Sequence, residues 1–512
     1  MKRMLVISLA SVVVIASGEA LGQETPEPGT PAPGTSEPGT SEPETWQSEI
    51  VERLNEVEDR LDKAEKHSLL DRITLSAEYR TIFNFFHYKG PTSDPWDLTN
   101  PADPMSLRQI TTTTKEVWSH RLRLKMIGEP VPSLRFTARL VCFRHFGDQD
   151  SPMMLMDSQS GRVPRDTSAR FDQLWIDWFM FPWLALSAGR VAWAEGNPNE
   201  LRENSDVQRG TAGLQMVDGE YETLTLTLNL SRWLTGTYLH AFYASWFNDN
   251  DDDAMGGFPF LSSGTDNLRI IGGNLDLVIP RIGRNFVQLG YYIVPRFTPF
   301  FVPIPDPAWD PNADYKHAPS FLSGSLLFPS RMPDSLGSYQ NFSMLVELYD
   351  LLGTNIDLFV AGAVGLLSPN GKGIEYDLEM GPGNRQSVPF LFLASQGDDG
   401  TTFFFYAGFR YTFPIRLKPK VGFEYNHGSR YAISFATPTD QLLTKLDTRG
   451  SAYEAYAILP INKHLFLRAS YLFIDNTYMT GFFGPNPAMV GSTAPRQEKK
   501  IHNFQLTLNA SI

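Results

Sequence analysis

The amino-acid sequence predicts an all-β protein: a transmembrane antiparallel outer-membrane β-barrel of about sixteen strands, preceded by a short coiled-coil helix. Three observations predict this fold. From residue 72 onward, apolar and polar side chains alternate with period two, the pattern of strands with one apolar face. The connections between these runs are alternately long and short. The alternation also continues to Ile512, as expected where a last strand pairs with the first and leaves no open edge.

Residues 1–22 have the features of a secretory signal peptide. Lys2 and Arg3 precede an apolar run from Met4 to about Ala16, and small residues follow, with a cut expected after Gly22. The alternative is a membrane anchor, but the run is too short to span a bilayer. We therefore expect an exported protein, located in the cell outer membrane.

Residues 23–45 are predicted to be a disordered linker. They include four near-copies of a pentapeptide, PEPGT PAPGT SEPGT SEPET, in which Pro and Gly prevent regular structure. The formal net charge is −13, and residues 24–71 hold thirteen acidic against four basic residues. Most of the acidity therefore lies before the strands, and the modest charge of the rest argues against binding to nucleic acid.

Residues 46–68 are predicted to form a coiled-coil stalk. Apolar side chains recur there at intervals of four and three residues, flanked by charged ones. A helix of about three heptads is too short to be stable alone, so we expect partner chains, most simply in a homotrimer. The alternative is a single helix on the barrel mouth. The seam consists of Ile50, Leu54, Val57, Leu61 and Ala64.

Cys142 is the only cysteine, which excludes an internal disulfide and haem attached through a Cys-x-x-Cys-His motif. We expect no cofactor and no metal. Asp249, Asp251, Asp252 and Asp253 form an acidic stretch without the distal Glu of a calcium-binding EF-hand, so a solvated loop tip is the simpler interpretation.

The predicted strands begin with ITLSAEYRTIFNFF, SHRLRLKMIG and LRFTARLVCF. Fifteen connections join the strands, eight long and seven short, which predicts sixteen strands with both ends on the side of the short turns. Residues 211–230 are interpreted as one strand. We expect aromatic side chains near strand ends to form interfacial girdles. They are Trp175, Trp178, Trp183, Trp233, Phe403–Tyr406 and Tyr471. The long connections are roughly 88–114, 148–168, 194–210, 248–267, 298–338, 368–400, 428–449 and 477–499.

Three blocks of sequence resemble a known family. GFEYNHGSRYAISFATPTDQLLTKLDTRGSAYEAYAILPINKHLFLRASYLFID (422–475) is similar to a family of bacterial outer-membrane proteins of unknown function. GRVPRDTSARFDQLWIDWF and GRVAWAEGNPNELREN resemble earlier blocks of the same family. The resemblance implies a porin-like barrel and names no substrate. The stalk and the strand number are also similar to the phosphate and polyphosphate porins, a likeness of architecture alone.

A barrel of this size encloses a water-filled lumen, so inward side chains are the candidate site. On the second and third strands, five basic residues are predicted to point inward and to favour anions. On distant strands two acids and one further arginine are predicted to face inward. The alternative is that these charges only pair with one another inside the wall. The pore-lining candidates are Arg121, Arg123, Lys125, Arg135, Arg139, Glu424, Glu454 and Arg468.

The predicted function is a porin that passes small hydrophilic solutes. The long connection 298–338 is a candidate constriction or lid, and the alternative is a disordered surface loop. One alternative is a barrel that sheathes a partner electron-transfer or export complex. A second is an outer-membrane phospholipase, because His427 and Ser429 would lie on one face of a strand. The strands beside them contain no Asn to orient the histidine, so an enzyme is not expected.

Overall fold

In the computed structural model the chain divides into two units, 1–67 and 68–512, and the described residues all belong to the second. The predicted signal peptide, linker and stalk therefore lie outside the described residues, as does the acidic stretch at 249–253. The described residues are 72–91, 110–145, 169–193, 201–204, 217–247, 268–280, 283–297, 304–305, 326–327, 333–379, 385–391, 400–433, 435–436, 445–478 and 496–512.

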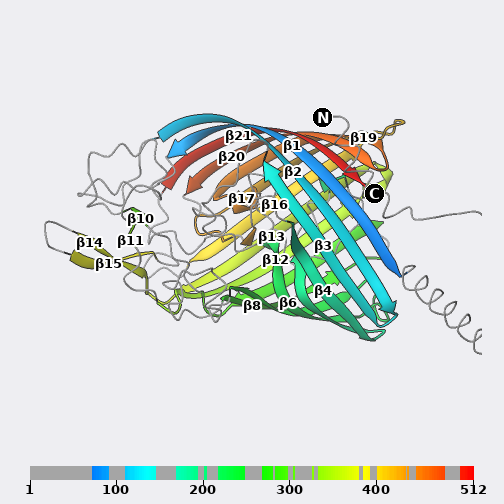
Figure 1. Cartoon of the computed structure of the whole chain (residues 1–512), viewed down its shortest axis with the longest axis horizontal. Helices are drawn as coiled ribbons and strands as arrows, with labels where there is room; N and C mark the ends of the chain where they lie inside the picture. Colours follow the sequence, from blue (N-terminus) through cyan, green and yellow to red (C-terminus); the bar gives the residue numbers. More distant parts are fainter. Residues whose placement is uncertain are drawn as a thin grey trace, which may run out of the picture. The chain divides into compact units, whose positions relative to one another are not determined.

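The described residues form a closed antiparallel barrel of sixteen strands, as the sequence predicts (Figure 1). Each strand pairs with its neighbours along the chain, and β21 closes the barrel by pairing with β1 from Lys89↔Lys500 to Glu78↔Ser511. The strands are β1 (Ile73–Pro91), β2 (Ile110–Val131), β3 (Leu134–His145), β4 (Arg170–Phe181), β5 (Leu184–Trp193), β6 (Val217–Asn229), β7 (Tyr238–Phe247), β8 (Leu268–Leu277), β9 (Arg284–Val294), β12 (Gly337–Tyr349), β13 (Ile356–Pro369), β16 (Thr401–Thr412), β17 (Lys420–Gly428), β19 (Gly450–Asn462), β20 (Leu465–Tyr478) and β21 (Arg496–Ser511).

The remaining described elements are short and lie in the connections. β10 pairs antiparallel with β11 and β14 with β15, and β18 pairs in parallel with the start of β6. Among the described residues, no helix has the length and hydropathy of a membrane span. These elements are β10 (Ile304–Pro305), β11 (Leu326–Leu327), β14 (Ile374–Glu379), β15 (Arg385–Leu391), β18 (Phe435–Ala436) and the 3-10 turns η2 (Leu351–Gly353) and η3 (Lys445–Asp447).

The seven predicted short turns are all found, and they lie at the end of the barrel where β1 begins and β21 ends. Residues 217–229 form the single strand β6, so the VDGEYE segment at 217–222 does not split it, and residues 211–216 of the predicted strand lie outside the described residues. The turn β12–β13 is tight: Asp350, Leu352, Gly353 and Asn355 all adopt positive φ. Asn and Asp tolerate this left-handed region better than most residues, and Gly adopts it freely.

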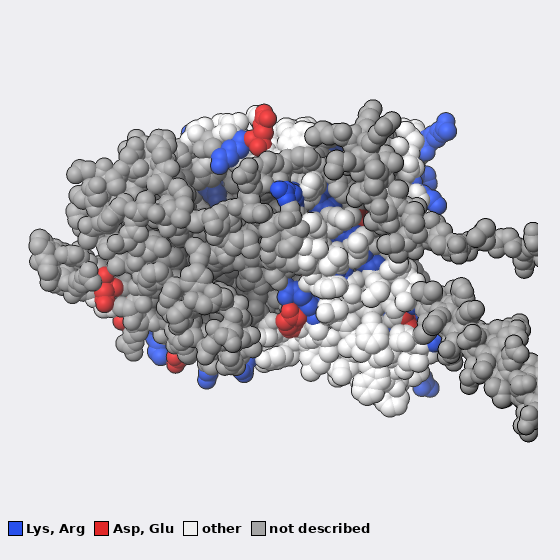
Figure 2. All heavy atoms as spheres, in the orientation of Figure 1, with Lys and Arg blue, Asp and Glu red and all other residues white. Residues whose placement is uncertain are grey.

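The outer face of the barrel is apolar and the inner face is largely polar. On β2, Leu122, Leu124 and Met126 are about two-fifths exposed, whereas Arg121 and Arg123 between them are buried. Figure 2 shows the outside only, where residues other than Lys, Arg, Asp and Glu cover most of the described wall. A protein folded in water would bury those leucines; a barrel in a bilayer turns them to lipid.

Two of the apolar clusters inside the barrel include side chains from connections between strands. One joins side chains of β6–β9, β12, β13 and β16 with Ala432 and Ile433, which follow β17. The other joins β9, β12, β13 and β16 with Leu201 and Leu446, which belong to connections between strands. Part of the inner wall is therefore apolar and covered by the chain's own connections.

The expected aromatic girdle is confirmed only in part. Trp178, Trp183, Trp233, Phe403 and Tyr471 are exposed on the outside, as predicted. Three of the expected girdle residues face inward instead: Phe404 and Tyr406 are buried in the interior clusters, and Trp175 Nε1 donates to Asp177 Oδ2 at 3.1 Å. The prediction was wrong for these three because successive residues of a strand point to opposite faces.

A substitution on β21 tests the assignment of faces. Leu506 is exposed on the outside, whereas Thr507 and Asn509 are buried inside, so Leu508 faces lipid. A charge on the lipid face costs about 2–4 kcal/mol at the bilayer midplane. Leu508→Arg is therefore expected to lower the yield of folded barrel in outer-membrane fractions more than Asn509→Arg. Equal yields would contradict the assigned faces.

Candidate functional site

The predicted basic residues of β2 and β3 do lie together on the inner wall, but acids lie among them. Arg139 makes a two-pronged contact with Asp172, with nitrogen–oxygen distances of 2.7–3.1 Å. Arg123 lies 3.9 Å from Asp172 and 3.8 Å from Glu78, and Arg121 also pairs with Glu78. The arginines thus form a paired network rather than a bare cationic wall, which is the alternative that the sequence left open.

The two other predicted basic residues are placed differently. Lys125 is half-buried. Arg135 lies close to the short-turn end of β3, where its side chain is 43% exposed and pairs with Glu129 at 2.7 Å. Its guanidinium also lies 5.4 Å from the ring centre of Phe179. Arg135 therefore contributes to the mouth of the barrel rather than to the buried network.

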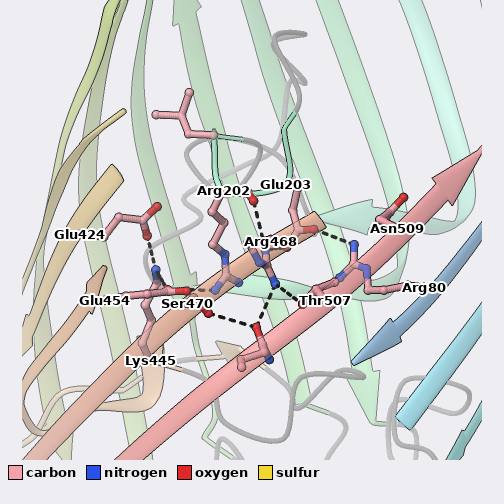
Figure 3. A network of polar contacts seen from close by, with 12 residues as sticks. Arg80, Arg202, Glu203, Glu424, Lys445, Glu454, Arg468, Ser470, Thr507 and Asn509 are labelled. Carbon is pink, nitrogen blue, oxygen red and sulfur yellow. Dashed lines mark hydrogen bonds and ion pairs between the residues drawn. The ribbon is translucent and has the colours of Figure 1, made fainter. Parts of the chain in front are cut away.

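A four-residue segment of the connection between β5 and β6, Leu201–Asn204, lies inside the barrel against β1, β16, β19 and β20; we call it the crossbar, and Figure 3 shows its residues Arg202 and Glu203. At one end, Leu201 packs into the apolar cluster of β9, β12, β13 and β16, and its carbonyl accepts a 2.9 Å hydrogen bond from Arg410 Nη1. Arg410 is itself held by Asp357 at 2.6 Å. Asn204 adopts φ +60°, a conformation that Asn tolerates better than most residues.

The charged side chains of the crossbar reach different strands. Arg202 Nη1 donates to Glu454 Oε2 on β19 at 3.2 Å. Glu203 accepts from Arg468 Nη1 on β20 at 2.7 Å and pairs with Arg80 on β1 at 2.8 Å. The crossbar therefore connects the apolar side of the interior with its charged side.

Glu424 and Glu454, both predicted to face inward, are direct partners across β17 and β19. Two like charges opposite each other are destabilising. Lys445 of η3 relieves this repulsion by donating to both carboxylates, at 2.5 Å to Glu454, and Arg202 provides a second cation. Tyr406 OH also donates to Glu424 at 2.5 Å. Two connections thus supply the cations that these strands need.

Arg468, the third predicted inward residue of this side, is fully buried and lies at the centre of the contacts. It donates to the carbonyl of Arg202 at 3.1 Å as well as to Glu203. Its second amino group donates to Gln505 Oε1 at 3.0 Å. Breaking this arrangement would leave a buried charge with fewer partners, which is strongly unfavourable.

Neighbouring charges keep the side chains of Arg202 and Glu203 ionised. Burial alone would raise the pKa of Glu203, but the guanidinium groups of Arg468, Arg80 and Arg202 outweigh burial and lower the pKa to about 2. Burial alone would lower the pKa of Arg202, yet the carboxylates of Glu454 and Glu203 raise it above its ordinary value. Both side chains are therefore charged at neutral pH.

This shift predicts an acid-sensitive contribution to stability. The pKa of Glu203 falls from an ordinary 4.5 to about 2 in the fold, a difference worth about 3 kcal/mol. Because the folded pKa is the lower one, this contribution is complete above about pH 4.5 and is lost as the pH falls toward 2. We expect the melting temperature of the native barrel to exceed that of Glu203→Gln by a margin that shrinks over this range. A margin that is constant between pH 5 and 2 would contradict the assignment.

Several of these residues were not among the candidates from sequence. Strict alternation along β4 would place Asp172 on the outer face with Leu174. An irregularity in the pairing of β3 with β4 turns Asp172 inward instead. Arg202 and Glu203 lie in a connection, where alternation gives no direction; their only signal was the GRVAWAEGNPNELREN block. The candidate constriction 298–338 lies mostly outside the described residues, so its role stays a prediction.

The histidine and serine considered for a phospholipase have separate partners. His427 Nδ1 lies 3.2 Å from Ser451 Oγ, on the neighbouring strand. Ser429 Oγ accepts a 2.9 Å hydrogen bond from the backbone N–H of Phe403. The geometry thus ties Ser429 to the backbone rather than to the histidine that would activate it.

Comparisons with known proteins place the chain in a family. No curated protein matches it in sequence. Similar solved structures include OprB of Pseudomonas putida (13% identity, 88% of this chain and 96% of that chain, TM-score 0.44). Others are an anion-selective porin from Comamonas acidovorans (10%, 86% and 99%, 0.43) and the outer membrane channel DcaP of Acinetobacter baumannii (10%, 86% and 97%, 0.42). Such low identities and TM-scores carry no information on the activity of this chain.

A family model described as "Protein of unknown function (DUF3373)" matches residues 111–278 and 316–502. The matched residues include the 422–475 block, whose likeness to a family of unknown function is confirmed, whereas the likeness to phosphate and polyphosphate porins stays a prediction. Because the match covers more than half of the chain, the protein belongs to this DUF3373 family.

Proposed function

We propose that the protein is an outer-membrane porin through which small hydrophilic solutes diffuse, with the crossbar at its narrowest point. One observation carries this proposal: a closed barrel of sixteen strands has an apolar exterior and charged and amide groups inside. Barrels of this size enclose an aqueous channel. The sheath alternative needs an open interior for a partner protein, whereas Leu201–Asn204 lie inside the barrel and contact β1, β16, β19 and β20.

The proposal is tested by solute entry into liposomes. Liposomes that contain the folded native chain are expected to swell in sugars and amino acids, faster for small solutes than for large ones. Protein-free liposomes provide the control. Swelling no faster than in this control, with the protein verified as inserted and folded, would contradict a porin function.

We further propose that the pore prefers anions. In the interior network of ion pairs, cationic groups outnumber acidic ones, and an ion responds to charges within a Debye length of about 8 Å. The cations are Arg80, Arg121, Arg123, Arg139, Arg202, Arg410, Lys445 and Arg468, and the acids are Glu78, Asp172, Glu203, Asp357, Glu424 and Glu454.

Removing the arginines of β2 and β3 tests this preference. The triple variant replaces Arg121, Arg123 and Arg139 by Gln and keeps Glu78 and Asp172. The charge of this part of the inner wall therefore becomes negative. The reversal potential in a KCl gradient is expected to move toward cations. Arg135→Gln, at the exposed mouth, is the matched control and should move it less. A cation-selective native pore, or a triple variant with native selectivity, would contradict the proposal.

The homotrimer expected from the heptad seam rests on residues outside the described ranges and stays a prediction.

A further inference from the structure

The barrel wall holds the crossbar as a binding site would hold a ligand. The neighbouring side chains of Arg202 and Glu203 are each bound by groups of opposite charge, Glu454 for the first, and Arg468 and Arg80 for the second. Figure 3 shows these partners on separate strands around the crossbar. The wall therefore presents an anionic and a cationic subsite side by side.

The wall also recognises the backbone of the crossbar. Arg410 Nη1 donates to the carbonyl of Leu201 at 2.9 Å, and Arg468 Nη1 donates to the carbonyl of Arg202 at 3.1 Å. The Leu201 side chain fills an apolar position between the inner strands. Two carbonyls, an apolar side chain, a cation and an anion are the recognition features of a short peptide.

The wall has hydrogen-bonding capacity that the crossbar leaves unused. Among the described residues, the buried atoms Glu424 Oε1, Tyr456 OH and Arg468 Nε have no hydrogen-bond partner. All three residues are less than 5% exposed. Buried polar atoms are normally satisfied, and leaving one unpaired is costly. These three atoms are therefore hydrogen-bonding capacity of the wall that the crossbar does not satisfy.

We propose that the groups that hold the crossbar form a binding site for short zwitterionic peptides, with Arg202 and Glu203 as a tethered occupant. The inference rests on the proposed channel function and names its solute class. The positive group of the peptide takes the place of Arg202 at Glu454, beside Lys445, its negative group binds at Arg468 and Arg80, and its carbonyls replace those of the crossbar.

The crossbar is attached to the barrel at both ends, and this attachment determines how strongly a free peptide should bind. A segment attached at both ends competes at an effective concentration in the millimolar range or above. A free peptide therefore binds the native chain weakly, because only the fraction of molecules with an undocked crossbar is available to it. Weakening the crossbar alone should raise the apparent affinity without any change to the wall.

Calorimetry on the full chain in detergent tests this competition. The probe is the peptide acetyl-LREN-amide, which has the sequence of the crossbar, and the control is acetyl-LERN-amide, with the two charges exchanged. In a chain with Arg202→Gln and Glu203→Gln, the apparent Kd for the probe is expected to fall at least about tenfold relative to the native chain. The exchanged peptide should bind neither chain measurably.

Adding Arg468→Gln to that double variant is expected to abolish binding, with the fold verified by circular dichroism. If this chain does not fold, Glu454→Gln is added to the double variant in place of Arg468→Gln. The comparison of the two peptides on the double variant tests the site independently of either addition. Equal affinity of the native and double-variant chains, equal binding of the two peptides, or no binding to the double variant would each overturn the proposal. Peptide binding without any conductance would support the peptide site and refute the channel function. Conductance without peptide binding would support the channel function and refute the peptide site.

Discussion

Asp172→Ala is expected to destabilise the barrel by about 3–5 kcal/mol, the range for removing one partner of a buried ion pair. Asp172 is fully buried and accepts from both Nε and Nη2 of Arg139, with Arg123 3.9 Å away. The loss leaves two buried guanidinium groups without this carboxylate. Denaturant unfolding in detergent, followed by circular dichroism, measures the change.

Glu129→Ala is the matched control, because Glu129 also pairs with an arginine of β3. Its partner Arg135 is 43% exposed and Glu129 itself 51%, so solvent screens the pair. Exposed ion pairs contribute about 0–1 kcal/mol. Equal destabilisation by the two substitutions would show that burial does not distinguish these pairs and would contradict the network described above.

Releasing the crossbar is expected to raise the single-channel conductance several-fold. Arg202→Ala with Glu203→Ala removes the side-chain contacts with Glu454, Arg468 and Arg80. The backbone contacts alone then hold a segment that blocks part of the interior. Conductance in planar bilayers, measured at the same salt for both chains, gives the comparison.

An outward-facing pair provides the control for this double substitution. Arg190 pairs with Glu222 at 2.6 Å. Arg190 lies in register with the exposed Leu174, and Glu222 alternates with the exposed Leu224, so both face outward. Arg190→Ala with Glu222→Ala should leave the conductance unchanged. An equal change in both double variants would mean that the crossbar does not narrow the path.

The strands could be predicted from sequence because each one must satisfy a local rule. One face meets lipid, so alternation along a strand such as β21 is visible without knowledge of its partners. The same rule predicts that Arg121, Arg123 and Arg139 point inward, because their position is set by Leu122, Leu124 and their neighbours, and all three arginines are buried. The turns were visible for a similar reason, because Gly, Pro and Asn gather where a strand must reverse.

The ion pairs could not be predicted in the same way. Alternation assumes an unbroken ladder, and the irregularity between β3 and β4 reverses the direction of Asp172. The crossbar depends on contacts between residues more than two hundred positions apart, such as Arg202 with Glu454. No local pattern indicates such a contact, so the basic wall seemed bare from sequence although acids from elsewhere neutralise much of it.

Single-channel recording on the purified native chain tests the central claim most directly. In planar bilayers the folded barrel is expected to produce discrete current steps, and in a KCl gradient these steps should reverse at a potential that indicates a preference for chloride. Folding is verified beforehand by circular dichroism and by a heat-dependent shift on gels. A folded, inserted chain without current steps, both in the native form and with Arg202→Ala and Glu203→Ala, would contradict the account of this protein as a channel.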